Sequence, residues 1–159
     1  MSAPFERPRF PQPWSSDVVS WSDSGGKLVL RRDGGRSATI ELVRCVNGRL
    51  RLAYPVAAHD VEVTIHDVTA SEHLTAVLRA VVDAVRESDP RCRKVVFAVD
   101  RHVSSRAELS PLTVVAAAEA AGFRYVVDVD IDDAELSLLV AEPEWVTAVD
   151  IDLDHVPGT

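Results

Sequence analysis

The sequence is poor in cysteine and has no long hydrophobic run. Its two cysteines, Cys45 and Cys92, are too few for a disulfide framework and lack the spacing of a metal site. We therefore expect two reduced thiols and no metal, with a Cys45–Cys92 bridge as the minor alternative. No apolar run approaches the ~20 residues that span a bilayer, and the N-terminus lacks the apolar stretch of a secretory signal. These absences argue against membrane and secreted proteins and predict a cytoplasmic location.

Positive charge is missing from the last fifth of the chain. The 159 residues carry 17 basic and 25 acidic side chains, a net charge of −8. From Val126 to Thr159 there are ten acidic residues and no lysine or arginine, so the first 125 residues hold 17 basic and 15 acidic side chains. A net acidic chain has no bulk electrostatic attraction for nucleic acid or an anionic membrane, and we expect neither as a partner.

Proline is concentrated in residues 1–24, which hold four of the nine prolines. Because proline blocks helix interiors and central strands, we expect an irregular N-terminal arm here and a single folded domain over residues 25–159. The arm also holds four aromatic residues: Phe5, Phe10, Trp14 and Trp21. We expect these side chains to pin the arm to the body of the protein or to a second subunit.

The first half of the predicted domain has the pattern of an antiparallel meander. Alternating apolar and polar residues predict four strands: 27–32, 37–46, 49–56 and 61–68. Two turn signals separate the first three of them, Asp33-Gly34-Gly35 and Asn47-Gly48. The fourth strand is expected to pair with the third.

The hydrophobic period then changes to that of a helix. An apolar stripe predicts a helix over residues 70–88, and Thr69 with Glu72 fits a capping box at its start. The stripe consists of Leu74, Val77, Leu78, Val81, Val82 and Val85. Lys94–Asp100 follows as a buried strand, which the crossover rule places parallel to residues 61–68.

A short second helix and an acidic hairpin complete the pattern. Ser110 is a good N-cap, Pro111 suits the first helical position, and Gly122 suits the residue after the helix. Two strands of a hairpin follow at 125–132 and 135–142, with a further strand expected at 145–154. The fold class is therefore α/β (α+β), with a mixed, mostly antiparallel sheet.

The order of these elements resembles the GCN5-related N-acetyltransferase (GNAT) superfamily. The resemblance covers residues 26–142 and is carried by 61–68, 70–88, 94–100 and the helix that runs into Gly122-Phe123. It implies that acyl-CoA lies where the fourth and fifth strands splay apart, with its pyrophosphate on the first amides of the long helix. A helix start offers unpaired N–H groups and a positive dipole end to an anion. The implied cofactor-binding residues are Val63, Ile65, Thr69, Ala70, Ser71 and His73.

The chain departs from the family's pattern at several positions. Residues 68–73 contain neither the arginine nor the glycines of the family's usual loop, Arg/Gln-x-x-Gly-x-Gly/Ala. Ala118 and Pro111 stand where the family often has tyrosine and asparagine, and its two helices between the first two strands have no counterpart. Two functions therefore stay open. One is acyl transfer from acyl-CoA to the primary amine of a small molecule or peptide; the other is a non-catalytic module that acts through homodimerisation or partner binding.

Two histidines are candidates for catalysis, because a transferase of this type needs a base for the acceptor amine. His66 lies at the end of the fourth strand, just before the long helix. His102 follows the parallel strand at its carboxyl end, where α/β folds gather ligands. The competing interpretation of each is a solvated side chain at a strand end, and the same holds for His73.

Two charge patterns have both a structural and a functional interpretation. Asp128, Asp130 and Asp132 look like the start of a calcium loop, but Asp133 and Leu139 occupy the positions that need glycine and glutamate. Strand alternation explains these acids better. Residues 27–51 carry seven basic side chains against two acidic ones. They form either a solvated face or a surface that meets the acidic C-terminal strands, within one subunit or across a dimer.

Overall fold

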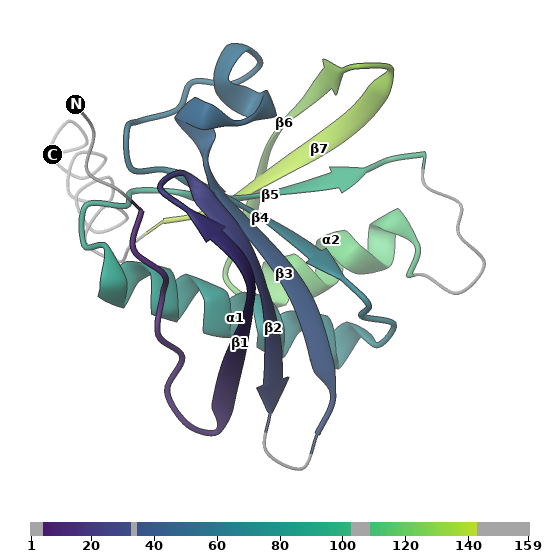
Figure 1. The fold of residues 1–159 in the computed structure, drawn as a ribbon. Helices are drawn as coiled ribbons and strands as arrows, with labels where there is room; N and C mark the ends of the chain where they lie inside the picture. Colours follow the sequence, from purple (N-terminus) through teal and green to yellow (C-terminus); the bar gives the residue numbers. More distant parts are fainter. Residues whose placement is uncertain (1–4, 33–34, 103–108, 143–159) are drawn as a thin grey trace, which may run out of the picture.

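In the part of the chain that the structure describes, seven strands form one mixed sheet, and two helices accompany it (Figure 1). The computed structural model describes residues 5–32, 35–102 and 109–142. The strands are β1 (Trp14–Ser22), β2 (Gly25–Arg32), β3 (Ser37–Arg44), β4 (Val61–His66), β5 (Val95–Asp100), β6 (Arg124–Ile131) and β7 (Ala134–Ala141). The helices are α1 (Ser71–Ser88) and α2 (Pro111–Ala120). The sheet order is β1-β2-β3-β4-β5-β7-β6, and β4–β5 is the one parallel pair, which confirms the predicted fold class.

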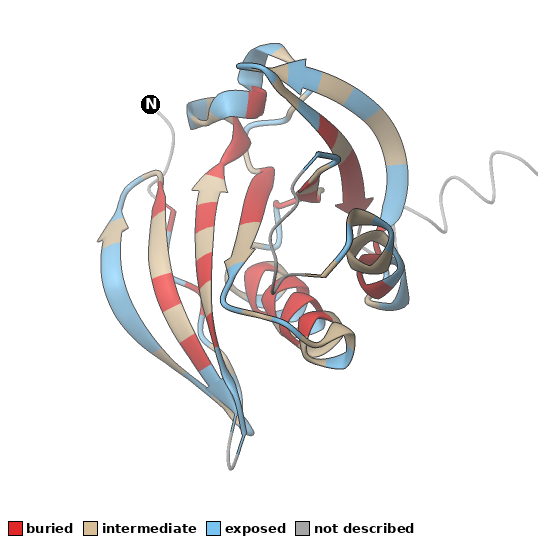
Figure 2. Cartoon of the chain, turned by 90° about the vertical axis from the view of Figure 1, so that its right-hand side faces the viewer, coloured by how far each residue is buried: buried red, intermediate tan, exposed pale blue. Residues whose placement is uncertain are grey.

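Both helices cover the same face of the sheet, and the main core lies between them and the strands (Figure 1). The predicted apolar stripe of α1 is buried along its whole length, which confirms the helix at residues 71–88. Figure 2 shows the buried residues gathered on α1 and at alternate positions of the central strands. Burial of each such aliphatic side chain stabilises the fold by roughly 1.5–3 kcal/mol.

The predicted strand over residues 49–56 is wrong. The structure has two 3-10 turns here, η1 (Cys45–Asn47) and η2 (Arg49–Leu52), and β3 pairs directly with β4. Leu50 is fully buried in a second core, on the far face of β5 and β7, whereas Leu52 is 89% exposed. The alternating leucines therefore do not mark a strand: Leu50 packs in the second core, and Leu52 faces solvent.

The interpretation of residues 1–24 as an irregular arm is wrong for Trp14–Ser22, which form β1. This strand pairs antiparallel with β2, and a bulge at Val18–Ser20 breaks its alternation. The expected pinning to the body is confirmed for Phe5, which is 2% exposed and lies in the main core. The Trp21 indole N–H donates to the Phe5 carbonyl at 2.8 Å. The folded unit thus includes segments before residue 25.

The two helix starts differ. Ala70 is the N-cap of α1, with no side-chain hydrogen bond, so the predicted capping box of Thr69 and Glu72 is wrong. The helix begins one residue too late for the Thr69 hydroxyl to cap it. The start of α2 is as predicted, because Ser110 Oγ accepts a hydrogen bond from the Thr113 amide at 3.2 Å. Gly122 follows α2 with a φ of 99°, a conformation that favours glycine.

Strands β4 and β5 pair at their beginnings and then separate. The parallel register joins Val61–Val63 to Val95–Phe97 and stops there. Residues 64–66 stay paired with β3, and residues 98–100 stay paired with β7. One backbone edge of each strand is therefore left without a strand partner, which is the splay that the family resemblance implies.

Two buried carboxylates lie at the paired end of β4 and β5. Asp60, fully buried just before β4, accepts hydrogen bonds from the amides of Ala57 at 2.8 Å and Lys94 at 3.1 Å. Glu62, 3% exposed, accepts from the guanidinium of Arg49 at 2.8 Å. Because each buried carboxylate has its donors, this end is held in one arrangement.

A second ion pair ties β3 to the end of α1 at the same place. Arg44 Nη1 lies 2.7 Å from Asp89 Oδ2, and its guanidinium lies 4.3 Å from the centre of the Phe5 ring. Burial alone would raise the pKa of Asp89, but hydrogen bonds from Arg44 and His59 outweigh it and hold the pKa below its usual value. Arg44 thus joins the N-terminal segment, the sheet and α1.

Both cysteines are free and buried, as expected for reduced thiols. Burial, reinforced by the Asp60 carboxylate, raises the pKa of both thiols, to about 12 for Cys92. Neutral, buried thiols of this kind are unreactive packing groups.

The basic and acidic hairpins lie at opposite ends of the sheet. The β2–β3 hairpin and the β6–β7 hairpin are separated by β4 and β5. In the described residues this rules out the expected contact between them within one subunit. The strand predicted at 145–154 lies outside the described residues. Neither described helix is both long enough and apolar enough to cross a bilayer.

Candidate functional site

A cleft of about 430 Å³ opens where β4 and β5 separate. We call it the β4–β5 cleft. Its lining comes from the two strands, the loop into α1 and the start of α2: Thr64, Ile65, His66, Asp67, Val68, Thr69, Leu74, Phe97, Ala98, Val99, Asp100, Leu109, Pro111 and Val114. The splay therefore produces a real cavity and not only a gap between strands.

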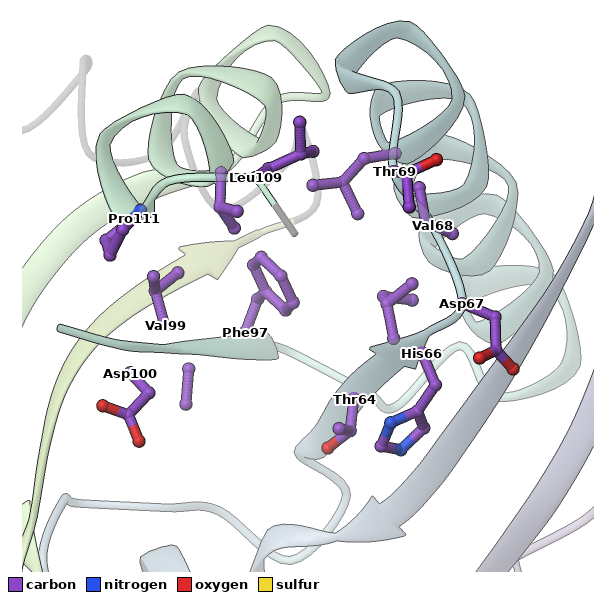
Figure 3. Close-up of a pocket in the computed structure, with 14 residues that line it drawn as sticks. Thr64, His66, Asp67, Val68, Thr69, Phe97, Val99, Asp100, Leu109 and Pro111 are labelled. Carbon is purple, nitrogen blue, oxygen red and sulfur yellow. The ribbon is translucent and has the colours of Figure 1, made fainter. Parts of the chain in front are cut away.

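The two sides of the cleft differ in chemistry (Figure 3). Phe97 and Val99 point toward the helix starts, where Val68 and Leu109 also lie. The Thr64, His66 and Asp100 side chains lie on the other side of the strands. An apolar side next to the helices and a polar side on the open face suit a ligand that passes through the splay.

Backbone donors gather at the helix side of the cleft. No side chain of the described residues caps α1, so the amides of its first turn, Ser71–His73, keep their hydrogen-bonding capacity. The turn into the helix passes through Asp67, whose φ is 64° and whose carboxylate accepts a hydrogen bond from the Thr39 hydroxyl at 3.1 Å. An uncapped helix start at a cavity favours an anionic group.

His66 is held by a carboxylate on the neighbouring strand. Its Nε2 lies 3.1 Å from Glu41 Oε1, and Lys27 Nζ lies 3.5 Å from the same oxygen. The three side chains form a row across β4, β3 and β2 on the open face. With Nε2 engaged by Glu41, His66 Nδ1 is the ring nitrogen left to take a proton.

The other predicted site residues are divided between the cleft and its surroundings. Ile65 and Thr69 line it, as does His66, but His102 does not. His102 pairs with Glu135 on β7 at 3.0 Å and is 68% exposed. His73 Nε2 meets the Ser37 carbonyl at 3.1 Å, at the start of β3.

The remaining three predicted cofactor-binding residues do not line the cleft. Val63 is 1% exposed and pairs with Phe97, below the point where the strands separate. Ala70 is the N-cap of α1, and Ser71 lines a shallow groove between α1 and α2. Ala70 and Ser71 can contribute backbone groups at the helix start, whereas Val63 serves the core.

The part of the lining that the structure describes contains carboxylates but no lysine or arginine. Asp67 and Asp100 are its acidic side chains, and Asp100 accepts a hydrogen bond from the His102 amide at 2.9 Å. Carboxylates at the mouth of a cleft favour a cationic ligand on that side.

Several lining residues were missed by sequence reasoning. Asp67 follows β4 and Asp100 is the last residue of β5, and the carboxyl end of a strand is where α/β folds gather ligands. Leu109, Pro111 and Val114 enter the cleft because α2 begins there. The sequence predicted the start of α2 but contained no signal for its place beside β5.

Comparison with solved structures identifies the fold. No protein-family model matches the sequence, and no curated protein matches it significantly. An uncharacterized protein from Bacillus halodurans has 17% identity and a TM-score of 0.63, with 76% of this chain and 60% of that chain covered.

The aminoglycoside acetyltransferase AAC(6')-Ib is similar to the same degree. Its complex with paromomycin and acetyl-CoA has 17% identity and a TM-score of 0.60, and the alignment covers 76% of this chain and 66% of that chain. Its complex with coenzyme A and kanamycin gives the same identity and TM-score, with 68% of that chain covered.

This chain thus spans about two thirds or less of the length of these neighbours. The overall fold is similar to that of AAC(6')-Ib, which was solved in complexes with acetyl-CoA and with coenzyme A. The chain has a GNAT-like fold, as its sequence predicted.

Proposed function

We propose that this chain binds an acyl-CoA in the β4–β5 cleft and transfers the acyl group to the amine of a small molecule or peptide. The observation that carries the proposal is the separation of β4 from β5 directly above the uncapped start of α1. Neighbours with the same fold bind acetyl-CoA or coenzyme A, which supports it.

The cleft fits such a ligand in three respects. The unpaired edge of residues 64–66 offers backbone groups to the amides of a pantetheine arm. Phe97, Val99 and Leu109 supply an apolar wall for the acyl chain. The Ser71–His73 amides lie at the end where a phosphate would sit.

The catalytic roles follow from what the chain places around the splay. The bound thioester supplies an activated acyl group. A backbone amide on the free edge of β4 is positioned to stabilise the oxyanion that forms at the acyl carbonyl. His66 takes the proton of the attacking amine at Nδ1, while Glu41 holds its Nε2. The new C–N bond forms as the thioester C–S bond breaks, and coenzyme A leaves as a thiolate that takes up a proton from solvent. His102 lies outside the lining, so we assign it no direct step.

The acidic side chains favour a cationic acceptor. Asp100 lies on the open face of the cleft together with His66, and Glu41 lies beside them. A protonated amine is attracted to such a face and loses its proton to His66 before it attacks. The aminoglycosides bound by AAC(6')-Ib support an amine acceptor of this kind.

Titration with acyl-CoA tests the proposal. Wild-type protein should bind acetyl-CoA or a longer acyl-CoA and show a rise in melting temperature with ligand concentration. Val68→Trp should fill the cleft and weaken binding by about tenfold or more. Val19→Trp, at a position 59% exposed on the edge strand, is the matched control and should bind normally. Absence of binding at millimolar ligand would contradict the proposal.

A second candidate is a non-catalytic module with this fold. It is favoured by the positions where the family often has tyrosine and asparagine. Ala118 is fully buried, and Pro111 lines the cleft without a donor group. Acyl-CoA binding without release of thiol in the presence of a panel of amines would favour the module. Sedimentation at high protein concentration would then show whether it acts as a homodimer.

A further inference from the structure

The proposed ligand poses an electrostatic problem for the β4–β5 cleft. Acyl-CoA carries several phosphate charges, whereas the lining formed by the described residues has two carboxylates and no lysine or arginine. The first turn of α1 adds Glu72. Free helix amides alone do not offset this charge, so the phosphates need cations from a neighbouring element.

The start of β3 contacts the first turn of α1. His73, in the first turn of the helix, meets the Ser37 carbonyl at 3.1 Å. Two residues further along β3, the Thr39 hydroxyl donates a hydrogen bond to the Asp67 carboxylate in the loop that leads into α1. The first residues of β3 and the start of α1 are therefore neighbours, although they are far apart in the sequence.

The alternation of the strands decides which arginines face the helix. Leu30 and Ala38 are buried on the face of the sheet that α1 covers. Two residues further toward the tip, Arg32 and Arg36 continue that face, and both are exposed. Arg31 lies on the opposite face, where it pairs with Asp17 at 3.6 Å.

The negative side chain of the first turn lies away from the hairpin. Glu72 lines the groove between α1 and α2, together with Thr75 and Leu112. His73, the next residue, turns toward the hairpin. A phosphate at the helix start on the His73 side would therefore lie near Arg32 and Arg36 and be separated from Glu72.

We infer that Arg32 and Arg36 hold the phosphates of the acyl-CoA and supply cations that the described lining residues do not. This inference rests on the proposed function. The guanidinium group suits the role, because it binds phosphate oxygens through paired hydrogen bonds. The hairpin thus binds the phosphates, a role that the family resemblance assigns to a loop at the start of the helix.

Calorimetric titration of three ligands tests this assignment: acetyl-CoA, dephospho-acetyl-CoA and S-acetylpantetheine, which has no phosphate. Arg36→Glu should weaken acetyl-CoA binding about tenfold, with a smaller effect on dephospho-acetyl-CoA and none on S-acetylpantetheine. Arg31→Glu is the matched control, because it makes the same charge change on the same hairpin but on the opposite face. It should change acetyl-CoA affinity by no more than about twofold.

Each outcome bears on a different claim. Equal losses for Arg31→Glu and Arg36→Glu would overturn the assignment and indicate a general effect of net charge. If neither Arg36→Glu nor the double variant Arg32→Ala/Arg36→Ala changes the affinity for acetyl-CoA, the assignment is overturned while the proposed function stands. A wild-type protein that binds none of the three ligands would overturn both.

Discussion

The two ends of the β4–β5 strand pair differ in whether their polar groups have hydrogen-bond partners within the protein. At the beginning of the strands, Val61–Val63 and Val95–Phe97 are paired, and buried Asp60 accepts hydrogen bonds on either side. At their carboxyl ends the same strands have separated, a helix start is uncapped, and a cavity lies between them. The first end satisfies its polar groups within the protein, whereas the second leaves them for a ligand.

This difference explains how one sheet can be both scaffold and site. A buried network in which every member has a partner holds the paired end of β4 and β5 in one arrangement. At the other end the two strands are no longer paired, and side chains such as Phe97 line the cavity between them. Mutations at the closed end should affect stability, and mutations at the open end should affect binding.

The largest effect should follow from breaking the closed end at Arg44. Arg44→Ala, at a buried arginine, leaves the partly buried Asp89 carboxylate without its main partner and removes the contact with Phe5. We expect a loss of about 3–5 kcal/mol in the free energy of unfolding, measured by urea denaturation. Arg51→Ala, at an exposed position, should change it by less than about 0.5 kcal/mol. Equal effects of the two variants would show that the network does not hold this end.

A smaller effect should appear in the pH dependence of stability. The pKa of Asp89 is lowered in the folded protein, so the unfolded chain takes up this proton first as the pH falls. The contribution of Asp89 is present above the ordinary carboxyl pKa of about 4 and is lost below it, through the folded-state value. Asp89→Asn should therefore show a shallower loss of unfolding free energy than wild type below about pH 4. Parallel curves would contradict the ion pair.

The smallest effect is expected from thiol reagents. Burial raises the pKa of Cys92 to about 12 and raises that of Cys45 as well, so neither thiol should react in the native protein at pH 8. Both should react at the rate of global unfolding when urea is added. Fast labelling of either thiol in buffer would show that the closed end opens locally.

The sequence predicted the half of the fold that contains the site. The stripe of α1, the parallel strand β5 and the turn at Gly122 each have a strong local signal, and the structure has all three. These elements place the splay next to the start of α1. The presence of the cleft therefore followed from local patterns together with the handedness of the crossover.

The sequence misled where local patterns have two meanings. The four prolines of residues 1–24 all precede Trp14, and the bulge in β1 hid the alternation of that strand. In η2, Leu50 is buried and Leu52 is exposed, a difference set by the second core and not by a strand. The neighbours of the cleft that come from α2 and from the β2–β3 hairpin depend on tertiary contacts, such as His73 with Ser37, that no local pattern contains.

The most direct test of the central claim is a map of backbone amide shifts on addition of acetyl-CoA, measured by two-dimensional NMR. The account predicts shifts at residues 64–66 and at Ser71–His73, on the open end, and little change at Asp60 and Val61–Val63 on the closed end. No shift at millimolar ligand, or shifts confined to residues outside the β4–β5 cleft, would contradict it.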